Sequence, residues 1–369
     1  MQAYSVEIVN SNFDLVHNDL VDVSTVNYEY DYLRLNESKV DVSYNSEVAN
    51  GYYIRIHNDI NDFFGVITAV TKGDNEGFMT ISYKPFISLF DIPFLYDTRS
   101  GGRMYLESLI ENEIKKAFVN NADTTQNISI IGTVQSLTQT IDWHFNIKSD
   151  VEGMNRAIIG LYDVIIKRAF SEYKVVVKAT PNYQTRKVDI TIGIVEDSVK
   201  YIETNLPNIL TKNIVIRESN QDVNKAIFYD TDGYPTPITY YLHTNGNYDT
   251  NGAIDRIMPV KFIMQGLQVE EGQTFQQAAQ MAAYETFGQI EYTNLIEIEL
   301  LQNDGLIEPK NIAIGQLVNI IYNGTVYPSI LSGYKISDTI GLIFGSVRLE
   351  LTELLKGGYF NGKYKASNI

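Results

Sequence analysis

The side chains that could carry chemistry are few and lie far apart in the sequence. The four histidines are His17, His57, His144 and His243, and no two of them lie within ten residues of each other. No HExxH-like pair is present, and the absence of cysteine excludes thiolate catalysis and cysteine-ligated metals. We therefore expect each histidine to be a surface residue or a hydrogen-bonded structural one.

One short motif imitates the start of a calcium-binding loop. In Asp230-Thr-Asp232-Gly, two carboxylates stand two residues apart, but Tyr234 and Tyr241 occupy the fifth and twelfth positions, where such a loop needs oxygen ligands. This departure excludes an EF-hand. A looser cation site at Asp230 and Asp232 stays open, while a tight turn before Pro235 is the favoured interpretation.

A second cluster could recognise a sugar. Tyr240, Tyr241 and Tyr248, beside Asn245 and Asn247, could stack on and hydrogen-bond a saccharide, although a strand and its turn explain them better. The 45 acidic residues always allow a carboxylate pair for glycoside cleavage, but nothing in the sequence singles one out. No GxSxG elbow, Walker loop or GxGxxG motif follows a predicted strand. We therefore predict no catalytic, cofactor-binding or metal-binding residue, no cofactor and no enzymatic activity.

The composition is that of a folded, acidic protein. Of its 369 residues, 44% are hydrophobic and 20% charged, which is typical of a globular chain with room for two or three domains. The net charge of −16 disfavours binding to DNA phosphates, and solubility alone explains it best. The N-terminus shows no signal peptide, and no apolar run approaches the roughly 20 residues that span a bilayer, so no membrane insertion is expected.

The elements that would position such residues are mostly strands, because the chain is rich in Tyr, Thr and Asn. Residues 51–84 match residues 315–348 without a gap, at a constant offset of 264. The match is mainly one of residue class over three strand-like runs, and its four identities are Gly51/Gly315, Asp74/Asp338, Gly77/Gly341 and Ser82/Ser346. We therefore expect two copies of one β-module, with Gly51 superposed on Gly315.

Residues 1–98 are expected to form the first module, with strands at 52–57, 65–70 and 77–83. Residues 99–200 are expected to form an α+β insertion that follows a linker at 99–103. The insertion combines an amphipathic helix, a second helix with an N-terminal capping box, and two strands, at 106–118, 149–169, 173–178 and 187–193 in that order.

Residues 201–369 are expected to form the second module. Its Asn323-Gly324 pair between alternating β-formers predicts a type I′ hairpin, because both turn residues tolerate positive φ. One packed helix is expected at about 273–288, opened by the capping box Thr274–Gln277. The strands are expected at 213–217, 224–229, 295–301, 318–322, 325–327 and 346–352, and a loose C-terminal segment from Lys356 to Ile369.

Two stretches resemble the hub proteins at the tail tip of siphophages, the tail-associated proteins in their short form. They are Ala226–Pro235 and Leu301–Leu351, and the second contains the Gly315–Tyr327 hairpin region. The similarity is to the short hub proteins of phages of lactic-acid bacteria and related Gram-positive hosts, and the order of modules extends it over nearly the whole chain. It implies a β-rich α+β fold: two tail-tube-like β-barrel modules with an intervening α+β domain, like the contractile-phage baseplate hub.

The resemblance also implies a role. In that family, three two-module chains form a pseudo-sixfold ring at the distal tip of the virion tail, after synthesis in the host cytoplasm. The implied partners are two further copies, the hexameric distal tail protein, the tape measure protein and, through the baseplate, receptor-binding proteins. The ring closes the tail channel and opens for DNA ejection without specific nucleic-acid binding. Because this chain ends at Ile369, soon after the second module, we do not expect the C-terminal extension of the long form.

Two other functions stay open. The richness in Tyr and Asn favours a receptor- or carbohydrate-binding baseplate protein as the main alternative, and a cell-wall hydrolase is less favoured. The host, the receptor, the gating trigger and the residues that line the channel are not readable from the sequence.

Overall fold

The computed structural model describes residues 3–22, 25–59, 61–72, 77–97, 104–139, 141–143, 156–195, 200–205, 209–215, 223–231, 236–243, 248–252, 260, 262–269, 273–287, 295–301 and 313–345. The contacts divide the chain into two compact units. Ile216–Thr293 is one unit, and the segments before and after it together form the other.

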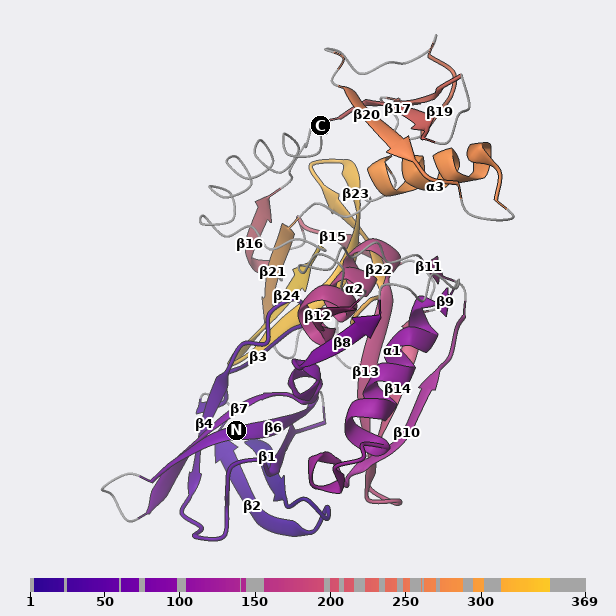
Figure 1. The fold of residues 1–369 in the computed structure, drawn as a ribbon. Helices are drawn as coiled ribbons and strands as arrows, with labels where there is room; N and C mark the ends of the chain where they lie inside the picture. The colour runs from indigo at the N-terminus through magenta and orange to yellow at the C-terminus, as the bar shows by residue number, and fades with distance from the viewer. Residues whose placement is uncertain are drawn as a thin grey trace. The chain divides into compact units, whose positions relative to one another are not determined.

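The larger unit begins with a six-stranded sheet in the order β2-β1-β5-β6-β7-β4, in which every neighbouring pair is antiparallel (Figure 1). Its strands alternate buried apolar and exposed polar side chains, as in β4, where buried Val40 and Val42 alternate with exposed Lys39 and Asp41. The strand bounds are β1 Ala3–Val9, β2 Leu15–Asp22, β4 Ser38–Ser43, β5 Tyr53–His57, β6 Asp62–Lys72 and β7 Phe78–Pro85.

The second sheet of this unit runs in the order β15-β22-β23-β24-β21-β16, and β3 from the N-terminal part of the chain adds to β23. The predicted type I′ hairpin joins β22 to β23, with φ of 51° at Asn323 and 78° at Gly324. The predicted strand 295–301 is confirmed as β21. The bounds are β3 Tyr28–Asp31, β15 Lys200–Glu203, β16 Ile209–Val215, β21 Leu295–Leu301, β22 Leu317–Tyr322, β23 Thr325–Ile336 and β24 Thr339–Phe344.

Both sheets curl as half-barrels, and the fold is β-rich α+β, as the sequence predicts. The apolar faces of the two sheets contribute to one continuous hydrophobic cluster, which includes Tyr4 and Ile56 from the first sheet and Ile320 and Phe344 from the second. Each such side chain contributes about 1.5–3 kcal/mol on burial. The two sheets therefore stabilise each other through a shared core.

A third group of elements carries the helices of the larger unit. The helix α1, Leu106–Ile114, continues as a π-helix over Lys115–Val119 and buries the predicted apolar stripe on one face of the sheet β10-β14-β13. The second helical stretch is a π-helix at Leu161–Ile166 followed by α2 at Lys167–Tyr173. The bounds of the sheet strands are β10 Ile131–Ser136, β13 Val175–Asn182 and β14 Lys187–Ile194, and short 3-10 turns lie at Phe86–Phe90 and Thr124–Gln126.

The predicted helix at 149–169 is partly wrong. Its capping box lies outside the described residues, and Arg156–Gly160 is a strand, β12, which pairs with β8 at Pro93–Asp97. Ile158 fits the helical stripe by spacing, but the cross-strand pairing of this segment overrides that local periodicity. A second short pair joins β9, Met104–Tyr105, to β11, Asp142–Trp143.

The smaller unit, 216–293, holds a four-stranded sheet in the order β19-β18-β17-β20, and α3, Phe275–Phe287, packs on one of its faces. The predicted capping box opens α3: the Gln277 N–H donates to the Thr274 hydroxyl (3.3 Å), and the Thr274 N–H donates to the Gln277 side-chain oxygen (2.9 Å). The bounds are β17 Lys225–Asp230, β18 Ile238–Leu242, β19 Tyr248–Asp249 and β20 Phe262–Leu267.

This smaller unit falls inside the stretch that the sequence assigns to the second module, and the module boundaries near residues 98 and 200 remain predictions. No helix among the described ranges is both long and apolar enough to cross a membrane.

Candidate functional site

The internal repeat is the most regular feature of the larger unit. Three backbone hydrogen bonds recur with donor and acceptor both shifted by 264 residues. In the first copy, N–H groups of Gly51, Tyr52 and Ile67 donate to the carbonyls of Ile67 (2.9 Å), Ala49 (3.3 Å) and Tyr52 (2.8 Å). In the second copy, Gly315, Gln316 and Leu331 donate to Leu331 (2.8 Å), Ala313 (3.0 Å) and Gln316 (3.0 Å).

The strand register repeats as well. β5 pairs with β6 from Tyr53↔Val66 to His57↔Asp62, and β22 pairs with β23 at the positions 264 residues later. A bulge follows Ile67 in β6 and Leu331 in β23, again at matched positions. Gly51 and Gly315 both adopt a left-handed backbone, with φ of 81° and 88°, which glycine tolerates best. The predicted equivalence of Gly51 and Gly315 is confirmed by these matched bonds.

The gapless match is wrong in its third strand. Ser82 pairs with Ala69, whereas the residue that pairs with Gly333 is Ile343, three positions earlier than a constant offset requires. The cause is the loop length, because five residues (73–77) separate β6 from β7 but only two (337–338) separate β23 from β24. Gly77 and Gly341 are therefore not equivalent. Asp74 and Ser346 lie outside the described residues, so the Asp74/Asp338 and Ser82/Ser346 matches stay predictions.

With that correction, the equivalence extends to a fourth strand. β4 pairs with β7 from Ser38↔Tyr83 to Ser43↔Phe78, and β21 pairs with β24 from Ile296↔Phe344 to Leu301↔Thr339. We call β4, β5, β6 and β7 the first strand unit, and β21, β22, β23 and β24 the second strand unit. One chain thus carries the same four-stranded hydrogen-bonding pattern twice.

The first and second strand units differ in the elements that pack against them. In the second strand unit, β3 pairs with the part of β23 beyond the bulge, from Gly333↔Asp31 to Ile336↔Tyr28. The next residue, Tyr32, extends this contact, because its N–H donates to the Ser332 carbonyl (2.9 Å). No described strand pairs with the same edge of β6 in the first strand unit.

Tyr32 also ties β3 to the helical part of the larger unit. The Tyr162 hydroxyl donates to the Tyr32 carbonyl (2.6 Å), and the Val177 N–H donates to the Tyr32 hydroxyl (2.8 Å). The Tyr28-Glu-Tyr-Asp-Tyr32 alternation is typical of a strand, but no local signal identifies β23 as its partner. The sequence did not predict this pairing, which is the main structural contact between the N-terminal part of the chain and the second strand unit.

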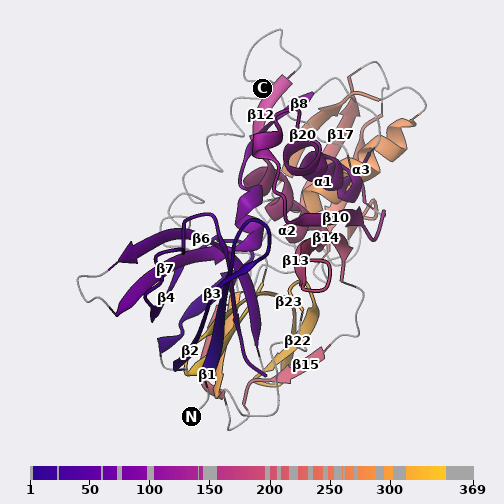
Figure 2. The same cartoon turned by 90° about the horizontal axis from the view of Figure 1, so that it is seen from below.

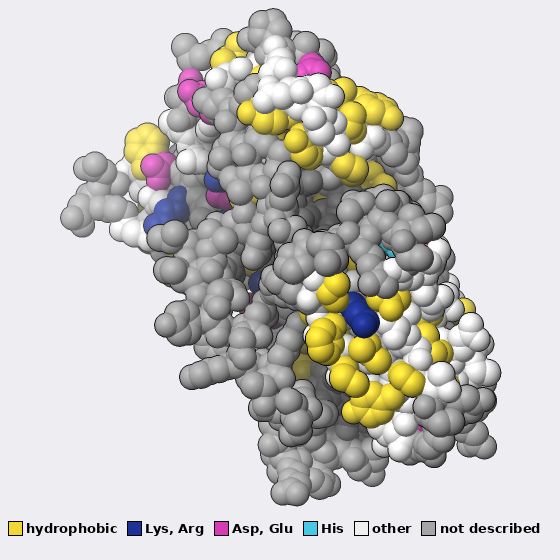
Figure 3. All heavy atoms as spheres, turned by 90° about the horizontal axis from the view of Figure 1, so that it is seen from above, with side chains coloured by type: hydrophobic (Ala, Val, Ile, Leu, Met, Phe, Trp, Pro, Cys, Tyr) yellow, Lys and Arg dark blue, Asp and Glu magenta, His cyan; other side chains and the backbone are white. Residues whose placement is uncertain are grey.

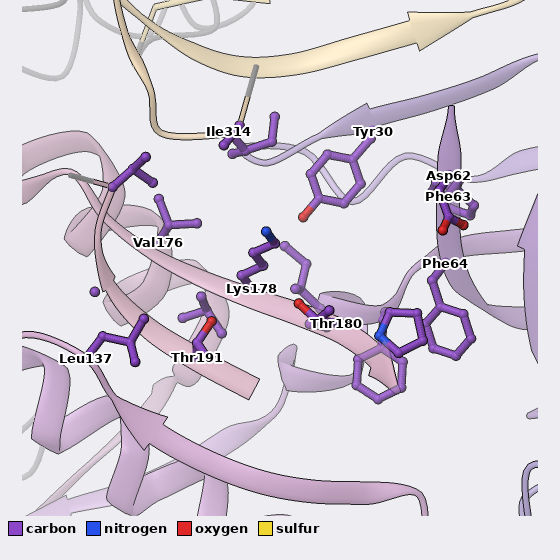
Figure 4. A pocket seen from close by; sticks show the side chains of 18 of the residues that line it. Tyr30, Asp62, Phe63, Phe64, Leu137, Val176, Lys178, Thr180, Thr191 and Ile314 are labelled. Atoms are coloured by element: carbon purple, nitrogen blue, oxygen red, sulfur yellow. The ribbon is translucent and has the colours of Figure 1, made fainter. Parts of the chain in front are cut away.

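A cavity of about 680 Å³ lies where the two sheets meet the β13–β14 sheet (Figure 4). Val176, Lys178 and Thr180 of β13 line one side, and Figure 4 shows Lys178 and Tyr30 pointing into the same space. The opposite walls are aromatic, and they consist of Tyr30 of β3, Tyr334 of β23, Phe63 and Phe64 of β6, and Phe86.

The cavity is not arranged for acid–base chemistry. Of the described lining residues only Asp62 and Lys178 carry charge, and Asp62 already accepts two hydrogen bonds from the Arg55 guanidinium, each 2.8 Å. The rings of Tyr30 and Tyr334 stack with centroids 5.4 Å apart, and burial raises the pKa of both hydroxyls above its ordinary value. Both tyrosines therefore stay neutral near pH 7 and serve packing and hydrogen bonding.

The three described histidines do not form a cluster. His17 lies buried in β2, His57 ends β5 in the same sheet, His243 lies in the smaller unit, and His144 lies outside the described residues. His243 contacts the Asp249 carboxylate at 2.9 Å. In the part of the chain that the structure describes, no three His, Asp or Glu side chains cluster as metal ligands.

The two motifs singled out in the smaller unit are placed only in part. Asp230 ends β17, while Asp232, its partner in the suggested cation site, lies outside the described residues, so that question stays a prediction. Tyr240 is 8% exposed, and its ring packs 6.3 Å from that of Tyr248, which lies 5.7 Å from Phe287 of α3. Tyr240 and Tyr248 therefore pack in the hydrophobic core of the smaller unit. Asn245 and Asn247 lie outside the described residues.

One face of the smaller unit is exposed and apolar. Phe262 and Met264 alternate on the face of β20 opposite to α3 and are 60% and 63% exposed, beside Tyr229 of β17 at 43%. The space-filling view in Figure 3 shows hydrophobic side chains gathered in patches on the side of the molecule seen from above. A face of this kind is typical of a contact surface.

Comparisons with known proteins bear on the fold. No protein-family model and no curated protein matches the chain. Among solved structures it is similar to the 43 kDa tail protein of prophage MuSo2 from Shewanella oneidensis, with a TM-score of 0.51 and 13% identity over 94% of this chain and 98% of that one. The chain has the fold of a phage tail protein.

Two further tail proteins share it. The tail protein from Neisseria meningitidis MC58 matches with a TM-score of 0.51 and 11% identity, over 93% of this chain and 97% of that one. The prophage tail protein gp18 from Listeria monocytogenes EGD-e matches with a TM-score of 0.50 and 12% identity, over 98% and 99% of the two chains. Since all three identities lie far below 25%, these similarities establish a common fold.

Proposed function

We propose that the protein is a structural component of a phage tail, a homotrimeric hub at the distal tip. The repeated strand units carry this proposal, because two equivalent units per chain give six equivalent positions in a ring of three chains. A threefold ring with six similar positions can match a sixfold neighbour. The shared fold with phage tail proteins supports the same assignment.

In this role, the ring joins the hexameric distal tail protein on one side to the tip on the other, next to the tape measure protein. It closes the tail channel before adsorption and opens it for DNA ejection, which requires two stable arrangements of the same subunits. The net charge of −16 suits a channel wall along which DNA slides without adhering. The role needs no catalytic residue, in keeping with the packing of the cavity.

The proposal is tested by mass and by position. Light scattering of the purified chain should give three times the 41.8 kDa chain mass, alone or on mixing with the distal tail protein. Because the chain has no cysteine, one introduced cysteine gives a unique label for electron microscopy of whole virions. Label on the tail axis at the tip supports the hub, whereas label on peripheral appendages, or cell-wall clearing lost with a single acidic residue, contradicts it.

The carbohydrate-binding alternative gains no support from the tyrosine cluster. A sugar platform presents an aromatic face to solvent, whereas Tyr240 is buried and Tyr248 packs on Phe287. Tight binding of the isolated chain to host saccharide would nevertheless overturn the hub proposal in favour of receptor binding.

A further inference from the structure

Among the described residues, no strand pairs with the edge of β6 at the place where β3 pairs with the edge of β23. Beyond the bulge, β23 has β24 on one side and β3 on the other, whereas β6 has β7 on one side and no described strand on the other. The exposure of matched side chains reflects this difference: Ser332 in β23 is 0% exposed, whereas its counterpart in β6, Thr68, is exposed. Figures 1 and 2 show β6 and β7 running together as a hairpin toward one side of the larger unit, with β4 beside β7.

The repeat identifies which backbone groups this edge presents. In β23, the Ser332 carbonyl faces β3, because it accepts from the Tyr32 N–H. Alternate residues of an antiparallel ladder face the same side, so Tyr334 and Ile336 face β3 too. Their counterparts in β6 are Val70 and Lys72, whose N–H and C=O groups therefore point to the open edge. Ala69 and Thr71 face β7 instead.

We propose that a strand from a second copy of this chain adds to the β6 edge at Val70–Lys72. An exposed row of backbone donors and acceptors is a template for such pairing. The occupant follows from the repeat. Within one chain the segment between β2 and β4 contributes β3 to the second strand unit, and a closed ring of alternating strand units needs the next contribution to cross between chains. The inference therefore rests on the proposed ring.

The surroundings of the edge fit a protein contact. Phe78 and Tyr44, at the same end of the hairpin, are 65% and 45% exposed, and the Lys72 ammonium lies 5.5 Å from the centre of the Tyr44 ring. The residue that occupies the place of Phe78 in the second strand unit is Thr339. Exposed aromatic side chains next to unpaired backbone groups are characteristic of interfaces between proteins.

One difference defines where the added strand must lie. A Cβ on Gly333 would meet the Tyr30 carbonyl at 2.8 Å, so β3 approaches closely only because residue 333 is glycine. The counterpart, Ala69, carries a Cβ. The added strand must therefore stand farther from Ala69 than β3 stands from Gly333, and its hydrogen bonds fall on Val70 and Lys72.

Amide hydrogen exchange resolved at single residues tests the proposal on the unmodified chain. The Val70 and Lys72 amides should exchange at least tenfold more slowly in the oligomer than in the diluted monomer. The Ala69 and Thr71 amides, which bond to β7, should be protected in both states and serve as the internal control. Equal exchange of Val70 and Lys72 in the two states overturns the inference.

Two variants sharpen the test. Val70→Pro removes an outward N–H, which an edge strand tolerates, so the variant should fold and associate at least about tenfold more weakly. Val70→Thr keeps the N–H and a β-branched side chain, and should associate as the parent does. If Val70→Pro does not fold, the exchange measurement decides alone.

The outcomes separate this inference from the hub proposal. A trimer whose Val70 and Lys72 amides stay unprotected overturns the edge pairing and leaves the hub intact. Protection that appears only when the distal tail protein is added also overturns it, because the occupant is then a different protein. A chain that stays monomeric both alone and in the assembled tail contradicts both proposals.

Discussion

The two strand units have the same backbone and different neighbours. In the second strand unit, β3 pairs with the β23 edge and Gly315 packs against β13. In the first strand unit, no strand of the described ranges pairs with the same edge of β6, and a Cβ on Gly51 would meet no atom within 4 Å. Backbone hydrogen bonds therefore define the module, and the residues that cover it decide which side chains each copy tolerates. Substitutions at matched positions should therefore reduce the free energy of unfolding by unequal amounts. The inequality measures how closely the neighbouring elements pack on each strand unit.

The matched glycines should show the largest contrast. Replacing either by alanine places a Cβ on a left-handed residue, at a cost of about 1–2 kcal/mol. At Gly315 the new Cβ would also lie 2.3 Å from the Val176 side chain, which adds roughly 1–3 kcal/mol of overpacking, while at Gly51 nothing lies within 4 Å. Urea denaturation should therefore give a clearly larger loss of unfolding free energy for Gly315→Ala. Equal losses would mean that β13 does not press on the second strand unit.

The next contrast lies just beyond the bulge. Gly333→Ala should cost about 1–3 kcal/mol, because the Cβ would meet the Tyr30 carbonyl and the Asp31 Cα at 2.8 and 3.1 Å and push β3 away. The reciprocal change, Ala69→Gly, should cost only about 0.5–1 kcal/mol, through chain entropy. Denaturation measures both, and faster amide exchange at Tyr32 in Gly333→Ala alone would show that β3 is the element displaced.

Tyr32 tests how strongly β3 is held. Tyr32→Phe leaves the buried Val177 N–H without its acceptor, at a cost of about 1–3 kcal/mol. Tyr162→Phe removes the donor to the Tyr32 carbonyl on the opposite side of the same residue and is the matched variant. Since both bonds hold one residue, the double variant should lose less than the sum of the two single losses, as measured by thermal unfolding. Simple additivity would show that the two bonds act independently.

The repeat also shows which parts of the fold the sequence could predict. The constant offset correctly matched β5 with β22 and β6 with β23, including Gly51 with Gly315. It succeeded there because the paired residues of the two hairpins are separated by equal numbers of residues. It misplaced the third strand, because three residues fewer in one loop shift every later match. Of the two identities that lie wholly within the described residues, Gly51/Gly315 is a structural equivalence and Gly77/Gly341 is not, since interchangeable β-formers are sufficient along the rest of each strand.

Contacts between segments far apart in the chain could not be predicted from the sequence. The pattern of Tyr28–Asp31 predicts a strand, but its partner, β23, lies about 300 residues away in the chain. Alternation of side chains indicates that a segment is a strand and does not indicate which strand it pairs with. The same applies to Arg156–Gly160, whose pairing with β8 decides against a helix. The tyrosines are a different case. Tyr240 and Tyr248 pack in the core of the smaller unit, as the favoured strand interpretation implies, but aromatic residues at that spacing fit a core and a sugar site equally well. The suggested cation site at Asp230 and Asp232 stays a prediction.

The smallest expected contrast is one of pH, and it should be confined to the first sheet. His17, buried in β2, has its pKa lowered by desolvation, which outweighs the opposing charge of Asp19, whereas the strands of the second strand unit contain no histidine. The unfolded chain, with an ordinary histidine pKa near 6.5, therefore binds this proton at higher pH than the folded chain. Stability should be constant above about pH 6.5, should fall as the pH drops below that value, and should level off once the pH is below the lowered pKa of the folded state.

The shifted carboxylates of the described ranges do not obscure this pH range. They are Asp19, Glu111, Asp123, Asp189 and Asp249, and the pKa of each is lowered, so their contribution is lost only at more acidic pH. Thermal unfolding between pH 7 and 5 should therefore show a decline that His17→Gln flattens. Amides of β1 and β2 should lose protection over this range while those of β23 and β24 keep it. A decline that persists in His17→Gln, or that appears equally in both sheets, would show that the first sheet does not hold the pH-sensitive group.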